Sequence, residues 1–440
     1  MNKKELIRNK RKNARLYPIY KMFSWDLLFY YSISFLFLTQ TKGLTASLIL
    51  FGDSFYPIFK MIFQIPCVIL NDKIGSKNTV VLGNLLVALS ILFLIIGNGL
   101  STLIFSNLIM AVGYTLKENC EPSMIDECIP NGKKKNSLFS RLDGKGSSNW
   151  YLLNAISATI TGFLFVFNNY LPMYLCFALL LLSTYLSSRF RVIKVDKNKT
   201  EEIQNHSSKE KLSFSILLKD YLKDLKIAFK FIFQSSRLRS LLIFSALFSS
   251  IYSMASTLNS SLLRDINIPE QYFGIIFAAL GIISSFMSTK QNKIQDKYKN
   301  RTLTFFSIPY SISFILLGGV IVFNINYALG LVIIFSMLAL QSSIVAPYWT
   351  TIKRYLNSFT TPSLITKIYS ASNLLNGIIR FVFALFCSYL MDVTTTSYSL
   401  MIIGTISLVM FIIVLKYMKT RVGLKPEEYK KKDIEFVELK

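Results

Sequence analysis

The chain has 440 residues, of which 52% are hydrophobic and only 17% are charged, and its mean hydropathy is +0.44. A soluble protein of this length needs more polar surface than this composition supplies. A formal charge of +25 is typical of nucleic-acid binders, but here the basic residues lie in the gaps between long apolar runs. The composition therefore predicts an integral membrane protein and excludes a nucleic-acid partner.

Twelve apolar runs follow one another along the chain, and each is close to the roughly 20 residues that a helix needs to cross a bilayer. The first six predict an N-terminal bundle over 22–189, and the second six predict a C-terminal bundle over 238–416. The expected fold is all-α and integral to the membrane, with twelve transmembrane helices in two pseudo-symmetric six-helix bundles. The runs lie at about 22–40, 44–71, 79–97, 101–127, 148–168, 171–189, 238–262, 269–289, 302–323, 327–349, 366–391 and 396–416.

Basic residues are concentrated in alternate loops between these runs, whereas the opposite loops contain little beyond Lys42 and Arg264. The positive-inside rule therefore places the basic N-terminus (1–21) and the C-terminal tail (417–440) in the cytoplasm. The basic loop residues are Lys73, Lys77, Lys133, Lys134, Lys135, Arg141, Lys145, Lys290, Lys293, Lys297, Lys299 and Arg301.

A long polar stretch at 190–237 separates the two sets of runs. Its second part places apolar residues on one helix face and lysines on the other, which predicts an amphipathic helix on the anionic inner membrane surface. A partly unstructured linker is the alternative. The apolar face holds Leu218, Tyr221, Leu222, Leu225, Phe229 and Ile232, and the basic face holds Lys219, Lys223, Lys226 and Lys230.

The sequence lacks the residue sets of an enzyme or a metalloprotein. His206 is the single histidine, which removes histidine-based triads and His-rich metal sites. There is no phosphate-binding loop, and the cysteines form no C-x-x-C pair. We therefore expect no catalytic residues, no metal and no cofactor. The cysteines are Cys67, Cys120, Cys128, Cys176 and Cys387.

The two halves repeat three features at nearly the same offset. The segment Asn71–Lys77 after the second run matches Gln295–Arg301 after the eighth, and Pro122 has a counterpart in Pro347. The third pair is Ser140-Arg141-Leu142 and Thr366-Lys367-Ile368. Duplicated six-helix halves are typical of transporters that bind their substrate where the halves meet.

The first of these segments resembles the loop motif of the major facilitator superfamily. Asp72, Lys73, Gly75 and Lys77 match it, whereas Val68 replaces its first glycine and Ser76 one of its basic residues. The resemblance implies a cytoplasmic gate in which ion pairs between helix ends exist in only one of two conformations. Asp296 and Lys297 are the corresponding residues of the second half. Solvated loop charges are the alternative.

Two export motifs of that family are missing. The arginine that many proton-driven exporters carry early in the fourth span is Asn107 here, and the fifth span has only Gly162 in place of a glycine- and proline-rich motif. Both departures weaken a prediction of drug–proton exchange.

Ionisable residues inside the apolar runs are the main functional candidates, because each costs about 2.5–3.5 kcal/mol or more at the bilayer centre unless it is sheltered. Glu118 and Glu121 share a helix face, and two carboxylates in a low-dielectric cavity favour retention of a proton on one of them. The alternative is a closed ion-pair network that only fixes helix packing. The candidates for a substrate or proton site are Asp26, Lys60, Lys117, Glu118, Glu121 and Arg380.

Aromatic residues and prolines supply further candidates. In the family resemblance, the first, fourth, seventh and tenth helices line the cavity, and their aromatic side chains are suited to stacking on a ligand. Packing and interface anchoring are the alternative. Pro122 and Pro347 are predicted bending points for alternating access, or else static kinks. The cavity aromatics are Trp25, Tyr30, Tyr252, Tyr348 and Trp349.

These features predict a secondary active transporter, not an enzyme, that moves a small polar solute, anionic or zwitterionic, by alternating access coupled to protons. An uncoupled facilitator or lipid exporter of the same fold and a transporter-like membrane sensor are the alternatives. The Lys, Asn and Ile content indicates an AT-rich prokaryotic genome and hence the bacterial inner membrane. We expect a monomer. The sequence leaves open the substrate and the direction of transport.

Overall fold

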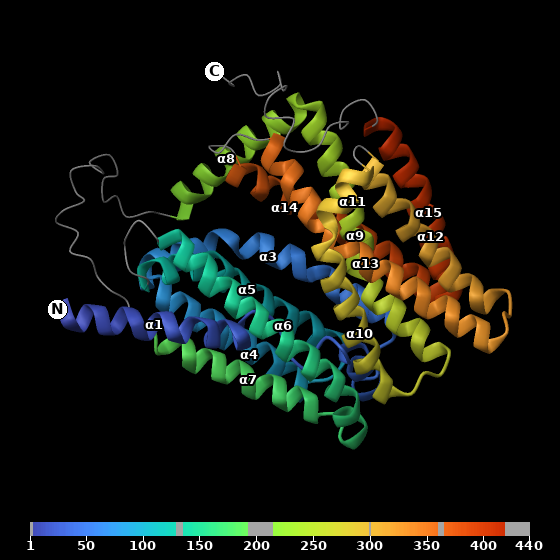
Figure 1. Ribbon diagram of the computed structural model, residues 1–440, viewed down its shortest axis with the longest axis horizontal. Helices are drawn as coiled ribbons and strands as arrows, with labels where there is room; N and C mark the ends of the chain where they lie inside the picture. The colour runs from blue at the N-terminus through green and yellow to red at the C-terminus, as the bar shows by residue number, and fades with distance from the viewer. Residues whose placement is uncertain (1–2, 129–134, 192–213, 299–300, 360–364, 419–440) are drawn as a thin grey trace. The chain divides into compact units, whose positions relative to one another are not determined.

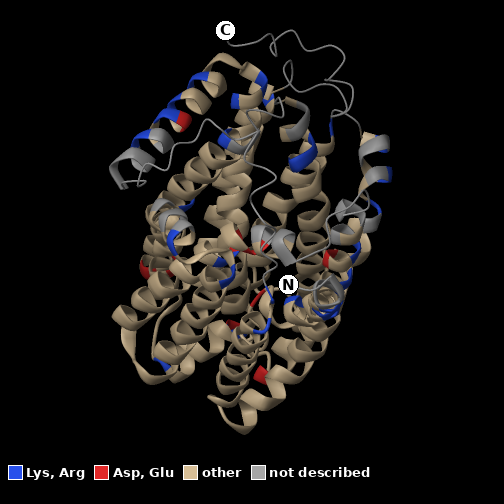
Figure 2. Ribbon diagram, turned by 90° about the vertical axis from the view of Figure 1, so that its left-hand side faces the viewer, with Lys and Arg blue, Asp and Glu red and all other residues tan. Residues whose placement is uncertain are grey.

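The computed structural model describes residues 3–128, 135–191, 214–298, 301–359 and 365–418, which are almost entirely helical (Figure 1). Eleven helices within these ranges are long and apolar enough to cross a membrane. Figure 2 shows that long stretches of the helices carry no charged side chain, as expected of segments that face lipid or a packed interior. Part of the central linker (192–213) and most of the tail (419–440) lie outside the described residues.

The chain divides into two compact units. The first contains Met1–Phe37, Thr41–Gly43 and Phe59–Tyr221, and the second contains Leu38–Gln40, Leu44–Ile58 and Leu222–Lys440. The helices of the N-terminal half are α1 (Lys3–Ser24), α2 (Ser34–Leu36), a π-helix (Phe37–Thr41), α3 (Ala46–Ile74), α4 (Ser76–Ile96), α5 (Gly99–Cys128), α6 (Lys135–Phe167) and α7 (Leu171–Ser188).

The first predicted span, 22–40, is not one helix. Instead, α1 begins at Lys3 and ends at Ser24, and residues 25–33 form turns before the short helical segments α2 and Phe37–Thr41. The Asp26 carboxylate accepts a hydrogen bond from the Leu27 backbone N–H at 2.9 Å, and Phe29 has a left-handed φ of 64°. Both features are incompatible with a continuing α-helix. The Asp26 side chain binds a backbone N–H in place of a helical carbonyl, and a left-handed φ at Phe29 does not occur within a right-handed helix. The apolar pattern alone did not indicate this break.

The residues assigned to a separate basic N-terminus belong to α1, which packs on α6 and α7. Two buried asparagines on α1 bind the chain just after α7. Asn13 exchanges hydrogen bonds with the Arg191 backbone at 2.8 and 3.0 Å, and Asn9 accepts one from the Arg191 guanidinium at 2.8 Å. These contacts fix the start of the chain to the end of the first six-helix set.

Two glycines allow α4 and α5 to approach each other closely in the first unit. A Cβ added to Gly113 on α5 would lie 2.8 Å from the Gly83 carbonyl oxygen on α4, and a Cβ on Gly83 would meet the Gly113 carbonyl at the same distance. Only residues without a side chain allow two backbones to approach this closely. The crossing fixes the position of Lys117, one turn further along α5.

The second unit combines the first part of α3 with most of the helices of the C-terminal half. Its core contains a group of aromatic residues in which Phe248 stacks on Tyr348 with ring centroids 3.7 Å apart. Buried amides link three helices, since Asn259 donates to Gln341 at 2.7 Å and Gln341 donates to Ser313 at 2.8 Å. The helices are α8 (Phe214–Gln234), α9 (Ser236–Asp265), α10 (Glu270–Thr289), α11 (Gln291–Tyr298), α12 (Thr302–Val322), α13 (Tyr327–Phe359), α14 (Ile365–Val393) and α15 (Thr396–Met418).

The helix pairs that pack together match between the halves when α1 is taken as the first helix of its half. Helix α1 packs on α5, α6 and α7, and its counterpart α9 packs on α13, α14 and α15. In the same way, α4 packs on α5 and α7, and α12 packs on α13 and α15. The repeat seen in the sequence is therefore also a repeat of helix packing.

Helix α8 covers the predicted amphipathic segment and has three distinct stripes. Its four lysines are exposed and lie within about 60° of one another at 3.6 residues per turn. Leu222, Phe229 and Phe233 form a neighbouring apolar stripe, whose Leu222 and Phe233 are exposed. Leu225 and Ile232 are buried. One stripe thus packs on the protein, and the other two are free for the membrane surface.

Candidate functional site

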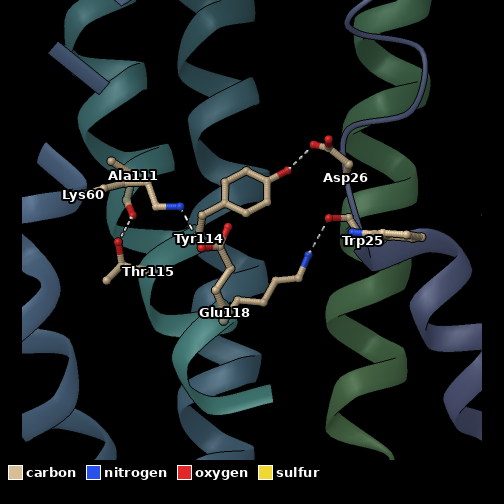
Figure 3. A network of polar contacts seen from close by, with 8 residues as sticks. Trp25, Asp26, Lys60, Ala111, Tyr114, Thr115 and Glu118 are labelled. Atoms are coloured by element: carbon tan, nitrogen blue, oxygen red, sulfur yellow. Dashed lines mark hydrogen bonds and ion pairs between the residues drawn. The ribbon is translucent and has the colours of Figure 1, made fainter. Parts of the chain in front are cut away.

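The Asp26 carboxylate lies in the break of the first span and is surrounded by donors. Its Oδ1 accepts hydrogen bonds from Leu27 N at 2.9 Å, from the Tyr31 hydroxyl at 3.0 Å and from the Tyr114 hydroxyl at 2.9 Å. Figure 3 shows Tyr114 reaching from α5 to Asp26. The acceptor is therefore held by local backbone, by its own segment and by a second helix.

One stripe of α5 carries the remaining groups. Tyr114, Lys117, Glu118 and Glu121 follow the spacing i, i+3, i+4 and i+7, which places them near one another on a helix. Lys117 is only 4% exposed, and its ammonium donates to the Trp25 carbonyl oxygen at 3.5 Å. The same nitrogen lies 5.1 Å from the Tyr114 ring centroid, within cation–π range.

Lys60 on α3 and Glu118 on α5 form an ion pair at 2.7 Å (Figure 3). Their side chains are 30% and 54% exposed, so a solute can reach this ion pair more easily than the buried Lys117. Lys117 and Glu118 are adjacent in sequence but differ sharply in burial. The helix thus presents one charged group to the interior and the next to an accessible surface.

Glu121 lies one turn beyond Lys117 on α5, close enough to Lys117 and Lys21 for electrostatic interaction. Lys21 on α1 forms an ion pair with Asp143 on α6, and the Tyr17 hydroxyl donates to the same Asp143 oxygen at 2.6 Å. The two predicted glutamates therefore differ in their partners: Glu118 forms an ion pair with Lys60, whereas Glu121 lies near Lys117 and Lys21, and Lys117 is within electrostatic reach of both glutamates.

Aromatic rings adjoin this cluster. Trp25 contacts Trp150 and Tyr151 of α6, with ring centroids 5.2 and 5.3 Å apart, and Lys21 lies 4.8 Å from the Trp25 ring. Tyr30 is buried and packs against Tyr31 at 5.4 Å. Of these rings, Trp25, Tyr31 and Tyr151 remain exposed enough to stack on a solute.

The other predicted candidates belong to the second unit. Tyr348 is fully buried against Phe248, which favours a packing role. Tyr252 is exposed and meets the half-buried Trp349 at 6.1 Å, so these two rings stay candidates for a ligand. Arg380 lies half-buried on α14, in the second unit.

The predicted gating residues lie at helix ends. Gly75 has a φ of 80°, which only glycine adopts without strain, and it joins α3 directly to α4. Lys73 is exposed and Lys77 half-buried, and Lys297 lies 5.5 Å from the Tyr298 ring in α11. The side chains of Asp72, Asp296 and Pro122 lie outside the described residues, and Pro347 is buried inside α13.

Three contributors escaped the sequence analysis. Tyr114 shares the α5 stripe with Lys117 and Glu118, so its spacing gave a usable signal that hydropathy did not. Lys21 and Asp143 come from segments taken as loops, and nothing in their local sequence indicates that they meet. Among the described residues, no group of three His, Cys, Asp or Glu is placed to hold a metal ion.

Comparisons with known proteins agree with this architecture. Residues 22–384 match the family model described as Major Facilitator Superfamily. A nucleoside transporter, NupG, superposes with a TM-score of 0.68 at 13% identity, covering 93% of this chain and 99% of that chain. A peptide transporter, POT, in complex with sulfate gives 0.61 at 16% identity, covering 94% and 96%. The comparison with curated protein sequences finds no match. The expected all-α membrane fold is confirmed.

Proposed function

Because the chain belongs to the Major Facilitator Superfamily, a family of transporters, we propose that it is a proton-coupled secondary transporter of a small polar solute. Alternating access of its two six-helix halves moves the solute. In this proposal the protein is a monomer of a bacterial inner membrane, with both termini in the cytoplasm.

The observation that carries the proposal is a charge imbalance in the first unit. The cluster contains four carboxylates, Asp26, Glu118, Glu121 and Asp143, against three ammonium groups, Lys21, Lys60 and Lys117. Two of the ammonium groups are committed to ion pairs with Asp143 and Glu118. Lys117 is then left to balance both Asp26 and Glu121, so one carboxylate lacks a counter-charge.

A proton is the simplest way to neutralise the remaining carboxylate in a medium of low dielectric constant. Three donors already hold Asp26, whereas no donor among the described residues forms a hydrogen bond to the Glu121 carboxylate, so we assign the exchangeable proton to Glu121. The groups that face Glu121 come from several helices. They are Tyr17, Tyr20 and Lys21 of α1, Lys117 and Glu118 of α5, and Asp143 of α6.

The accessible Lys60–Glu118 pair supports an anionic or zwitterionic solute. A solute carboxylate can replace Glu118 at the Lys60 ammonium, and a solute ammonium can bind the freed glutamate. Trp25 and Tyr151 offer ring faces beside this cluster. Dipeptides, amino acids and organic acids fit these features. Nucleosides should also be tested as ligands, because one of the similar structures is a nucleoside transporter.

The ion pairs Lys21–Asp143 and Lys60–Glu118 favour a second candidate, an uncoupled facilitator in which the charges only hold the helices together. Thermal stabilisation of the purified protein by each solute class would identify a ligand. Uptake of that ligand into proteoliposomes, with and without an imposed pH gradient, then separates the two candidates. Accumulation against the solute gradient requires proton coupling, whereas a facilitator only equilibrates the solute.

A further inference from the structure

The C-terminal end of α1 is a negatively polarised site inside the first unit. Helix α1 ends at Ser24, so its last carbonyl groups have no partners within the helix and carry the negative end of its dipole. The Trp25 carbonyl oxygen follows directly, and the Asp26 carboxylate comes next. In transporters, an interrupted helix with exposed carbonyl groups is suited to binding a coupling cation.

A side chain of this protein already occupies that position. The Lys117 ammonium reaches across from α5 and donates to the Trp25 carbonyl at 3.5 Å, and Asp26, Glu121 and Glu118 lie within electrostatic reach of it. Lys117 is almost wholly buried, and the Tyr114 ring lies 5.1 Å from its nitrogen. Carbonyl, carboxylate and aromatic groups thus surround the Lys117 ammonium at the end of a half-helix, and Lys21, paired with Asp143, is a second positive charge within electrostatic reach.

We propose that Lys117 is a tethered counter-cation that occupies the cation position of the broken first span and excludes alkali metal ions from it. This inference rests on the proposed function, because it explains why a proton, and not Na⁺, serves as the coupling ion. A covalently attached ammonium has a very high local concentration, so a free metal ion competes poorly for the same oxygen atoms.

Two substitutions of Lys117 distinguish the effect of its charge from the effect of its volume. Lys117→Ala leaves the α1 terminus and Asp26 without their counter-charge, leaves Glu121 with only Lys21, and opens space for an ion, whereas Lys117→Met removes the charge but fills the space. An uncompensated buried charge is strongly destabilising, so Lys117→Ala should take up a small cation when one is supplied.

The test is the thermal unfolding of purified full-length protein at constant ionic strength and pH, in NaCl, LiCl, KCl or choline chloride. We expect the melting temperature of the wild type not to change from one salt to another, and the same for Lys117→Met. Lys117→Ala should melt several degrees higher in NaCl or LiCl than in choline chloride. Equal melting of Lys117→Ala in all four salts, or a selective Na⁺ response of the wild type, would overturn the proposal.

A charge-balanced control guards against simple misfolding. Lys117→Ala combined with Glu121→Gln keeps the cavity but removes one of the uncompensated carboxylates, so its response to Na⁺ should be much smaller. If Lys117→Ala folds only when it is prepared in NaCl, the proposal is supported. If it folds in no salt while the double variant folds in all of them, the proposal is wrong.

This measurement uses neither a solute nor a pH gradient. A negative result therefore refutes the tethered cation and leaves the proton role of Glu121 to its own transport test. Conversely, a chain without proton coupling can still show the Na⁺ response of Lys117→Ala.

Discussion

The Tyr114 hydroxyl lies 2.9 Å from Asp26 Oδ1 and joins α5 to the broken first span. Tyr114 is 6% exposed, so water has little access to replace it as a donor. This bond connects the segment where the backbone is irregular to the helix that carries Lys117, Glu118 and Glu121. It thereby holds the charged cluster to the end of α1.

We expect Tyr114→Phe to lower the free energy of unfolding by about 1.5–3 kcal/mol, the usual range for a hydrogen bond to a charged group. Tyr31→Phe is the matched control, because Tyr31 donates to the same oxygen but is 50% exposed, and it should cost clearly less. Denaturation of both variants in one detergent measures the difference. A Tyr31→Phe effect as large as that of Tyr114→Phe would contradict the prediction that the buried hydrogen bond stabilises the protein more than the exposed one.

The Lys60–Glu118 pair should contribute little to stability. Both side chains are partly exposed, and ion pairs of this kind are worth about 0.2–1 kcal/mol. A double-mutant cycle with Lys60→Met and Glu118→Gln measures this interaction directly. A coupling energy well above that range would favour the facilitator alternative, in which the pair is structural.

The Gly83–Gly113 crossing should tolerate no side chain. Gly113→Ala places a Cβ 2.8 Å from a carbonyl oxygen and 2.9 Å from the Val87 nitrogen, so the backbones must separate. We expect a loss of about 1–3 kcal/mol, typical of overpacking. In Gly281→Ala the new Cβ meets nothing within 4 Å, and this exposed helical site should gain about 0.5–1 kcal/mol. Thermal unfolding of both variants compares them, and equal melting temperatures would show that the crossing is looser.

The apolar stripe of α8 should lie among lipid chains while its lysines stay in water. Nitroxide labels at positions 222 and 223, in a background without the five cysteines, report their surroundings in liposomes that contain anionic lipid. We expect the label at Leu222 to collide more with oxygen and the label at Lys223 more with a water-soluble nickel complex. Labels that are equally exposed to water would place the helix away from the membrane.

Hydropathy was sufficient to predict most of the membrane helices, because lipid imposes length and composition on each span. It failed at the first span, where Asp26 and the left-handed Phe29 interrupt an apolar run that looks continuous. The repeat predicted from Asp72 and Asp296 corresponds to matching helix pairs.

The candidate site was predictable only in part. Helical spacing placed Glu118 and Glu121 on one face, but their different partners depend on Lys60 and Lys21, which come from other helices. The contact between Lys21 and Asp143 joins residues 122 positions apart. No local pattern encodes such a contact, because helix packing brings it about.

The most direct test is solute accumulation in proteoliposomes under an imposed pH gradient, for the wild type and Glu121→Gln. Glu118→Gln is the comparison, because this carboxylate has its own counter-ion at the proposed solute position; it should weaken solute binding but keep gradient-driven accumulation. We predict that the wild type accumulates the stabilising solute only when the gradient is present. Glu121→Gln should exchange the solute but fail to accumulate it. Full gradient-driven accumulation by Glu121→Gln would contradict the assignment of the proton site.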